Sequence, residues 1–497
     1  MGLRRTLFCI VLCLCGGPLA SAYTVRHDAS GRTLRWPASL LPIEYRIGFS
    51  GSIEQDGTLT GAVVRALQAW NRVPGSYLRF RYAGRTRTDR AAPDGENCVI
   101  WVTRGWRHRP DAIAYTTAWV DASGRIVDTD IELNAQRFTW STTGAVGAFD
   151  VQNTVTHEGG HEAGLAHSLE WTGTTMFPII MLGEVLKRSL DGDDIDAVRA
   201  LYPVAGSEIV LYEPAGEGDA LRPVRTGLLR EGEGGTLKLA LRADADGDGA
   251  DEFALFRGGR RPSFSLVASV PGSGEPVVIA SDEWEVPSGE VEDAAAIDVD
   301  GDGLEELIVL KDDETLAHQE VLVYDMPAWG DLDETQAQPP VARDAWRIPS
   351  GDTVLALFAV RQPGGPSLGV VKATADGAPA LVLSTPPRRG DATEQDAARG
   401  TSVPVLLPRG FAFTDIDAAD LDGDGTDEIV VLDQDGDQAT VRVYDLTLDE
   451  HAPALTLTLR QELPVPLADG ERALGLVGID LDGAGVDRLG ILHAATR

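Results

Sequence analysis

The spacing of hydrophobic and polar positions changes repeatedly along residues 36–203, between the two-residue period of strands and the longer period of helices. IEYRIGF (43–49) alternates as a half-buried strand does. GAVVRALQAWNRV (61–73) carries apolar side chains three and four positions apart, which predicts an amphipathic helix. Further strands are predicted at residues 98–102, 112–120 and 124–134.

Two more helices are predicted from the signals at their ends. A helix over residues 150–167 is expected to begin with Asp150 as its N-cap. Another over 191–202 has acidic residues in its first turn and Pro203 after its end. These elements predict an α+β domain over 36–203, preceded by a lead-in at 23–35 and followed by a short linker before residue 207.

From Ser207 onward the chain becomes rich in Gly, Asp and β-forming residues, and one pattern recurs. The copies DADGDGADEFALF, DVDGDGLEELIVL, DLDGDGTDEIVVL and DLDGAGVDRLGIL begin at Asp244, Asp298, Asp420 and Asp480. They lie about sixty residues apart, with one double interval that holds a decayed copy at residues 356–372. The spacing therefore predicts five repeats.

A second kind of strand follows these loops and indicates how the repeats close. EVLVYDM (320–326) and TVRVYDL (440–446) are two copies, and SEIVLYEP (207–214) stands before the first repeat. The fifth repeat has no such copy of its own, so we expect the strands near residue 207 to complete it. Residues 207–497 are thus predicted to form an all-β propeller of five blades; a row of hairpins or a sandwich is the alternative.

The first 22 residues have the form of a secretory signal peptide. Arg4 and Arg5 precede the apolar run LFCIVLCLC, and a small-residue site, ASA, ends at Ala22. Cleavage after Ala22 would place the mature chain outside the cell, with a periplasmic location as the alternative. Lipidation at Cys13 or Cys15 is less favoured, because Leu precedes each, and the apolar run disfavours myristoylation of MGLRRT.

The net charge limits the binding partners of the chain, and the cysteine content limits its disulfides. The chain of 497 residues has 43 Lys and Arg against 77 Asp and Glu, a net charge of −34. Such a field repels nucleic acid and anionic membranes and attracts divalent cations, so we expect no nucleic-acid partner and no membrane insertion after signal cleavage. Cys98 is the one cysteine outside the signal. A single cysteine cannot form an intramolecular disulfide, and Cys98 is predicted to be a small buried residue.

The segment HEGGHEAGLAHS (157–168) carries the most specific chemistry. His157 and His161 are four residues apart, so a helix places both imidazoles on one face. Gly164 permits a turn that would bring His167 back as a third ligand. Three His ligands leave one position open on a single catalytic zinc, and Glu158 is expected to remove a proton from the zinc-bound water.

This segment resembles the zinc motif of metzincin metalloproteases, in particular the matrixin (matrix metalloprotease-like) branch. TTMFP resembles the Met-turn, with Met176 beneath the metal, and LDGDDIDAVRALYP resembles the last matrixin helix. The resemblance implies a zinc endopeptidase acting on proteins or peptides. It also implies that strand 112–120 pairs with extended substrate, and that residues 183–189 line part of the specificity pocket.

Several positions depart from the animal enzymes of this family. The sequence between Ala22 and the first strand leaves no room for their inhibitory pro-segment. No second zinc is expected, and His108 is predicted to be solvated. Asp128 and Asp130 are predicted to lie on an exposed strand face, with contact to calcium as the alternative. Glu162 is predicted to lie on the solvent side of its helix.

The repeat loops place acids at positions 1, 3, 5 and 9 and glycine at position 6, which suits calcium. An EF-hand is excluded, because its twelfth position here is an apolar strand residue. The pattern resembles the FG-GAP repeats of integrin-like propellers, which implies about three calcium ions. The implied ligands are Asp244, Asp246, Asp248, Glu252, Asp298, Asp300, Asp302, Glu306, Asp420, Asp422, Asp424 and Glu428. The fourth loop has Ala484 and Arg488 in place of acids and is expected to hold no ion.

The sequence thus favours an exported zinc endopeptidase whose propeller docks a substrate, surface or matrix ligand. Two alternatives remain. One is an adhesion or binding protein with a non-catalytic metzincin domain, and the other is a zinc hydrolase that acts on a non-protein amide. The first of these is disfavoured because Glu158 and all three histidines are present.

Overall fold

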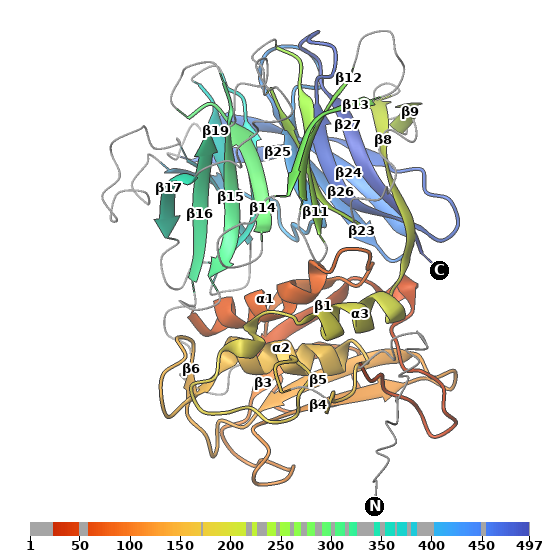
Figure 1. The fold of residues 1–497 in the computed structure, drawn as a ribbon, viewed down its shortest axis with the longest axis vertical. Coiled ribbons are helices and arrows are strands. Elements are labelled where there is room, and N and C mark those ends of the chain that lie inside the picture. Colours follow the sequence, from red (N-terminus) through yellow and green to blue (C-terminus); the bar gives the residue numbers. More distant parts are fainter. Residues whose placement is uncertain are drawn as a thin grey trace, which may run out of the picture.

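The computed structural model contains two bodies joined end to end (Figure 1). It describes residues 23–48, 58–169, 172–214, 221–225, 236–244, 249–258, 263–269, 276–283, 291–299, 304–313, 318–325, 342–347, 353–362, 365–374, 379–384, 402–448 and 454–496. The predicted signal peptide lies outside these residues. We refer to residues 23–203 as the N-terminal domain and to residues 204–496 as the strand-rich domain.

The N-terminal domain is built on a five-stranded sheet with the order β2-β1-β3-β5-β4. β4 is antiparallel to β5, and the other neighbours are parallel. The elements are β1 (Ile43–Gly48), α1 (Thr58–Asn71), β2 (Phe80–Thr86), β3 (Asn97–Trp101), β4 (Ala114–Val120), β5 (Ile126–Leu133), β6 (Trp140–Ser141), β7 (Phe149–Asp150), α2 (Val151–Glu162) and α3 (Gly192–Leu201). The predicted α+β domain and its main elements are confirmed, although α2 ends five residues earlier than expected.

The ends of the helices follow their caps. Asp150 accepts a hydrogen bond from the backbone N–H of Asn153 and so confirms its predicted role as the N-cap of α2. Asp191 and Asp194 form a reciprocal capping box at the start of α3. Cys98 is 1% exposed on β3, as predicted.

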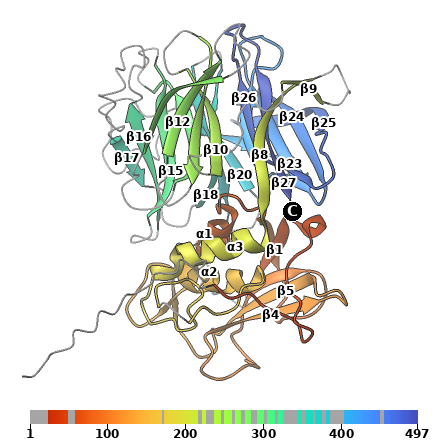
Figure 2. The same cartoon turned by 45° about the vertical axis from the view of Figure 1, so that its right-hand side comes forward.

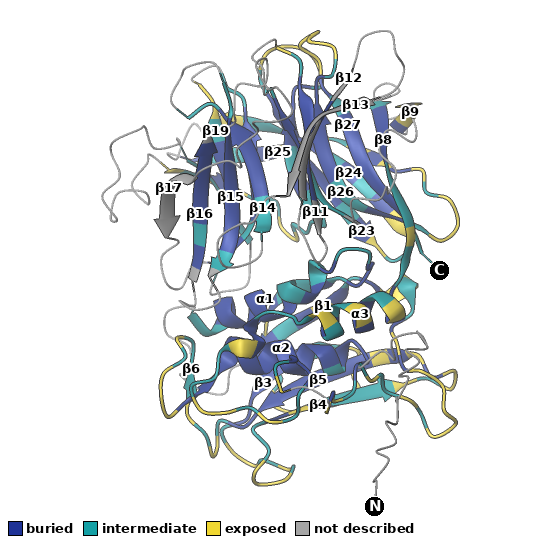
Figure 3. Ribbon diagram, in the orientation of Figure 1, coloured by how far each residue is buried: buried dark blue, intermediate teal, exposed yellow. Residues whose placement is uncertain are grey.

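α2 is buried on both sides, which corrects one prediction. It packs against α1 on one face and against β4 and β5 on the other, and it is coloured as buried in Figure 3. Glu162 is therefore not solvated: it is 2% exposed and accepts a hydrogen bond from Thr129 Oγ1 at 2.7 Å. Burial raises its pKa to about 8.

The strand-rich domain consists of four-stranded antiparallel groups. The groups are β10–β13, β14–β17, β18–β21, β22–β25 and, with strands from both ends of the domain, β26-β27-β8-β9. A short parallel pairing of β21 with β25 joins the third and fourth groups. Their bounds are β8 Val204–Pro214, β9 Leu221–Arg225, β10 Thr236–Ala243, β11 Glu252–Gly258, β12 Ser263–Ser269, β13 Pro276–Glu283, β14 Val291–Ile297, β15 Glu306–Asp313, β16 His318–Asp325, β17 Ala342–Arg347, β18 Thr353–Val360, β19 Ser367–Ala373, β20 Pro379–Ser384, β21 Ser402–Leu406, β22 Asp415–Ala419, β23 Glu428–Asp435, β24 Gln438–Leu448, β25 Leu455–Pro464, β26 Glu471–Ile479 and β27 Arg488–Thr496.

The first strands of these groups contact one another in a closed series. β10 contacts β14, β14 contacts β18, β18 contacts β22, β22 contacts β26, and β26 contacts β10. β27 lies between β26 and β8, and Leu489 pairs with Tyr212 in the antiparallel register. We call the series of first strands the inner strands.

The two domains are connected by β8 without a linker. The predicted linker is already strand from Val204 onward, and Figure 2 shows β8 rising from the end of α3 into the strand-rich domain. Its first residue donates a backbone hydrogen bond to Gly75 at 3.0 Å. A strand that is hydrogen-bonded to both domains restricts their relative orientation.

Side chains reinforce this junction. Arg72, directly after α1, forms an ion pair with Glu292, and Arg81 of β2 forms one with Asp433 at 2.7 Å. Deeper in the interface, Arg65 donates to Thr353 Oγ1 at 3.0 Å, and Gln152 Nε2 donates to Asp312 Oδ2 at 3.0 Å. Gln152 lies in the first turn of α2, so the strand-rich domain contacts the predicted zinc-binding helix directly. Within the described residues, no helix combines the length and apolar character needed to cross a bilayer.

Candidate metal centre and active site

His157, His161 and His167 converge on one point. Their Nε2 atoms are 3.3 Å apart for His157 and His167, and 3.0 Å apart for His161 and His167. Imidazole nitrogens are preferred zinc ligands, and this donor set fits one zinc ion.

The opposite nitrogen of two of these rings is held by a backbone carbonyl. His157 Nδ1 donates to Thr175 O at 2.6 Å, and His161 Nδ1 donates to Leu165 O at 2.9 Å. Because Nδ1 carries the proton in these bonds, Nε2 of each of these two rings is available as a metal ligand. Burial lowers the pKa of His157 well below its usual value and that of His161 to about 3, which favours the neutral imidazoles that a metal binds.

The turn after α2 brings His167 back to the other two rings. Gly164 has a φ of +99°, and a Cβ there would overlap the carbonyl oxygen of Leu34. Leu165 N donates to Gly160 O at 2.8 Å across the turn. Met176 is 2% exposed, and its sulfur packs so closely on Gly160 that a Cβ there would overlap it. The predicted Met-turn residue therefore lies directly against the helix that carries two of the histidines.

Glu158 is buried beside this centre. It is 6% exposed, and Thr116 Oγ1 on β4 donates to its Oε2 at 2.5 Å. Burial raises the pKa of Glu158 to about 7, while Thr116 and Arg26 act in the opposite direction. A carboxyl group with a pKa near the working pH is suited to accept and return a proton.

Arg26 and Thr116 are site residues that the sequence did not indicate. Residues 23–35 run along the turn after α2, where Arg26 N donates to Gly164 O at 2.8 Å. The Arg26 guanidinium donates to His161 O at 3.3 Å and acts on the pKa of Glu158. No local pattern links either residue to the zinc motif, because each reaches the site through the tertiary fold.

The region of His108 also differs from the prediction. His108 Nε2 lies 2.6 Å from Glu132 Oε2, and its ring stacks on Tyr115 with centroids 4.0 Å apart, so it is not simply solvated. Asp128 and Asp130 are 3% and 1% exposed, which contradicts the expected exposed face. They accept hydrogen bonds from the backbone N–H groups of Gly95, Ala92 and Cys98, and so order the loop that covers this side of β5.

Of the three loops predicted to bind calcium, the Asp420 loop is described in full, and its carboxylates lie close together. Asp420, Asp422 and Asp424 have carboxylate oxygens within 4.8 Å of one another. Asp420 accepts from Gly423 N and Gly425 N at 2.7 and 2.8 Å. Glu428 accepts from Leu421 N at 3.0 Å. Of the other implied ligands, Asp244, Glu252, Asp298 and Glu306 are described, whereas Asp246, Asp248, Asp300 and Asp302 lie outside the described residues.

An arginine approaches this loop. Arg460 lies 2.8 Å from Asp422 and 2.8 Å from Glu428. In the fourth loop, Arg488 lies 3.2 Å from Asp482 and 3.1 Å from Glu213. In both loops a guanidinium therefore pairs with the aspartate at position 3, which is Asp422 in the third loop and Asp482 in the fourth.

The acid at position 8 of each loop joins neighbouring groups of strands. Asp251 accepts from Asp480 N at 2.8 Å, and Glu305 from Asp244 N at 3.0 Å. Asp487 accepts from Asp420 N at 2.8 Å, and Asp427 accepts from Arg361 N at 2.7 Å. An acid at position 8 of all four copies is visible in the sequence. The calcium prediction used positions 1, 3, 5 and 9 and so missed this role of position 8.

A buried arginine connects two of these acids. Arg242 on β10 is 5% exposed and lies 2.8 Å from Asp427 and 2.9 Å from Asp487. Arg361 forms ion pairs with the same two acids. The charges are thus paired across three groups of strands besides that of β10, which offsets the desolvation of each.

Comparison with known proteins supports the assignment of the N-terminal domain. Residues 35–203 match the family model of Matrixin. The match, together with the convergent histidines, supports a matrixin-like, zinc-dependent metalloprotease domain, a class of hydrolase that acts on proteins or peptides. The match covers the N-terminal domain and not the strand-rich domain. No curated protein was found that matches the chain.

Proposed function

We propose that the protein is an exported zinc endopeptidase. His157, His161 and His167 hold the metal, and Glu158 is the general base. The observation that carries this proposal is the convergence of three Nε2 atoms beside a buried carboxyl group of raised pKa. When bound, the zinc supplies Lewis-acid activation of a water molecule and of the scissile carbonyl.

Residues of the chain transfer the proton and orient the groups that take part in the reaction. Glu158 accepts a proton from the attacking water and passes it to the leaving amine. Thr116 orients the carboxyl group through its hydrogen bond to Oε2. Arg26 places a positive charge beside Glu158 and fixes the end of α2 through His161 O.

Substrate is proposed to bind along β4. Within the described residues this strand pairs with β5 on one side and forms the outer edge of the sheet on the other. An extended peptide can add to such an edge by main-chain hydrogen bonds. The loop after Met176 exposes four large apolar side chains, which favours apolar substrate side chains: Ile179, Met181, Leu182 and Leu186.

For the strand-rich domain we propose a five-bladed propeller that docks a substrate, surface or matrix ligand. Support comes from the five four-stranded groups and the closed series of inner strands. We further propose that the first three repeat loops bind calcium, with the twelve ligands named above. We also propose that the protein is secreted after removal of residues 1–22.

The test is cleavage of an unfolded protein by the chain starting at Tyr23, at fixed calcium, beside Glu158→Ala. Both proteins are assayed with and without a zinc chelator, and their zinc content is measured. Cleavage by the wild type alone, abolished by the chelator, is the expected result. A wild type that binds one zinc but cleaves no peptide library would overturn the peptidase proposal.

A further inference from the structure

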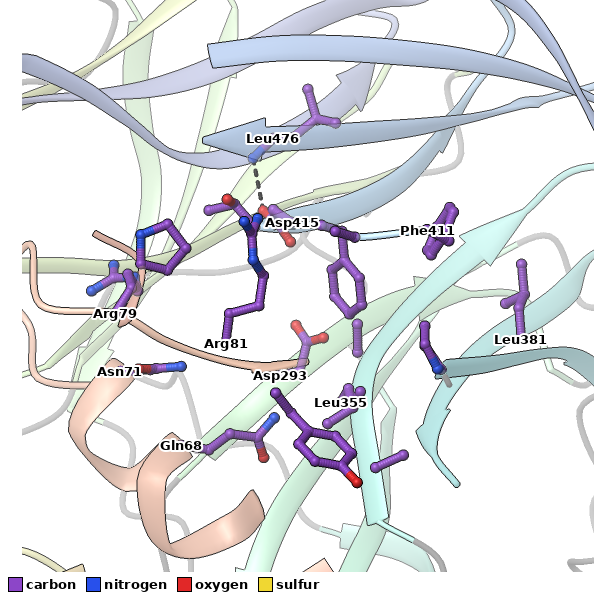
Figure 4. A pocket seen from close by; sticks show the side chains of 18 of the residues that line it. Gln68, Asn71, Arg79, Arg81, Asp293, Leu355, Leu381, Phe411, Asp415 and Leu476 are labelled. Carbon is purple, nitrogen blue, oxygen red and sulfur yellow. Dashed lines mark hydrogen bonds between the residues drawn. The ribbon is translucent and has the colours of Figure 1, made fainter. Parts of the chain in front are cut away.

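A cavity of about 920 Å³ lies where the N-terminal domain meets the inner strands, away from the histidine centre. Figure 4 shows side chains from both domains around it, with Gln68, Asn71, Arg79 and Arg81 from the N-terminal domain. The volume is within the range of sites that hold small organic ligands. Its two walls differ in chemistry.

The wall from the strand-rich domain is largely apolar. Leu355, Leu381, Phe411, Phe413 and Leu476 line it. Two aspartates are also present, but their oxygens are already used by backbone N–H groups. Each side chain joins neighbouring inner strands.

Each aspartate accepts two backbone hydrogen bonds of ordinary length. Asp415 accepts from Ile416 N at 3.0 Å and from Leu476 N at 2.7 Å, the bond drawn in Figure 4. Asp293 accepts from Ala294 N at 2.9 Å and from Leu357 N at 2.7 Å. Burial raises the pKa of Asp415 to about 6 and that of Asp293 well above its usual value. Both oxygens of each aspartate thus accept backbone hydrogen bonds, and neither side chain forms an ion pair with a described arginine.

The wall from the N-terminal domain is cationic. Arg72 and Arg81 are paired with Glu292, Glu44 and Asp433. Arg79 forms no ion pair with any described carboxylate; its guanidinium donates to the carbonyl oxygens of Ser76 and Leu78. Burial, and then the neighbouring Arg472, lower the pKa of Arg79 to about 10, while the charge of Asp415 acts in the opposite direction. Within the described residues the half-buried Arg79 guanidinium thus lacks an ion pair, and Asp415 is the one carboxylate of the cavity wall whose charge acts on it.

We propose that the interdomain cavity binds an amphipathic carboxylate, with its anionic group at Arg79 and its apolar body along Leu355, Leu381 and Phe411. The chemistry fits an aliphatic acid or the C-terminal end of an apolar peptide. Binding would place one ligand in contact with both domains. The site is independent of the histidine centre, so its test does not depend on peptidase activity.

The experiment is calorimetric titration of the full chain carrying Glu158→Ala, so that a peptide probe stays intact. The probes are dodecanoate, dodecanol, and an acetylated tri-leucine with either a free or an amidated C-terminus. One saturable site is expected for a carboxylate, at least about tenfold tighter than for its uncharged counterpart. Dodecanoate binding identifies an aliphatic acid as the source, and binding of the free peptide alone identifies a chain terminus.

Two variants on the cavity wall localise the site. Arg79→Met removes the cation, and Gly475→Leu reduces the volume, because a Cβ at Gly475 meets its nearest atoms at an ordinary 3.5 Å. Each is expected to weaken binding at least about tenfold. The matched controls are Arg109→Met on an exposed loop and Gly192→Leu at the exposed start of α3.

Three results would overturn the proposal. The first is that neither carboxylate binds. The second is that dodecanol or the amidated peptide binds as tightly as its carboxylate counterpart. The third is that a folded Gly475→Leu variant, checked by circular dichroism, binds like the wild type; this variant keeps the proposal falsifiable should Arg79→Met fail to fold.

Discussion

The histidine centre and the Asp420 loop use their donor atoms in opposite ways. At the histidine centre, His157 and His161 turn Nδ1 outward to carbonyl oxygens, and this leaves the Nε2 atoms facing one another. At the Asp420 loop, the carboxylates accept backbone N–H groups, and Arg460 approaches from outside. The first site is preorganised for a cation, whereas the second must exchange internal partners for one. We therefore expect tight zinc and weak calcium binding.

The largest expected effect tests the first site. Glu158→Gln removes the proton acceptor while the three histidines stay in place. Turnover should fall by about 10³-fold, the scale of general acid–base catalysis, and zinc content should stay at one per chain. Glu162→Gln is the matched control on the same helix and should retain activity. Equal loss in both variants would indicate a general disturbance of α2 instead of a catalytic role for Glu158.

A smaller effect tests the contribution of Arg26. Arg26→Met removes the charge beside Glu158 and the bond to His161 O. We expect kcat to fall about tenfold, which corresponds to about 1.4 kcal/mol, with zinc content and KM unchanged. The control is Arg32→Met, since Arg32 lies in the same segment but pairs with Asp28 at the surface. A change in KM alone would contradict the assigned role.

The calcium loop can be tested by removing its competitor. Arg460→Met frees Asp422 and Glu428 from the guanidinium, so calcium affinity should rise about tenfold in a calorimetric titration. Adding Asp422→Asn should cancel the gain and so assign it to this loop. Arg442→Met, which loses ion pairs outside the loop, should leave affinity unaltered. An unchanged affinity for Arg460→Met would argue against calcium at this site.

The smallest effect concerns the pH dependence of the strand-rich domain. Burial raises the pKa of Asp417 to about 7, although Arg242 and the N–H of Gly478 act in the opposite direction; Asp415 adds to the increase. The folded state therefore binds a proton that the unfolded state has released between about pH 4 and pH 7, and this stabilisation is lost as pH rises.

In Asp417→Asn this contribution disappears, while Asn Oδ1 can still accept from Gly478 N. The Tm of the wild type should decrease more steeply from pH 5 to pH 7 than that of the variant. The difference amounts to at most about 1.4 kcal/mol per pH unit. Parallel Tm curves measured by calorimetry would show that Asp417 does not titrate in this range.

The parts of the fold predicted correctly are those set by local rules. The cap at Asp150, the four-residue spacing of His157 and His161 and the turn at Gly164 each depend on residues close in sequence. For the strand-rich domain, the repeat period predicted where strands begin. Arg26 and Thr116 depend on contacts between distant segments, and no period or spacing in the sequence encodes these.

The errors share one physical cause. Glu162, Asp128 and Asp130 were expected at the surface because charged side chains usually lie there. Each lies on an element covered on both sides, where hydrogen bonds from Thr129 or from backbone N–H groups compensate for burial. Alternation of polar residues alone does not distinguish a solvated face from a face covered by a loop.

The pairing of β27 with β8 has a consequence for biosynthesis. β8 leaves the ribosome long before β27, so its edge stays unpaired while the intervening repeats are made. The N-terminal domain has all of its strands by then and is free to fold first. A chain that is truncated before residue 488 would keep the histidine centre but lack β27, so the edge of β8 would stay exposed. Such an exposed edge favours aggregation and removal by quality control.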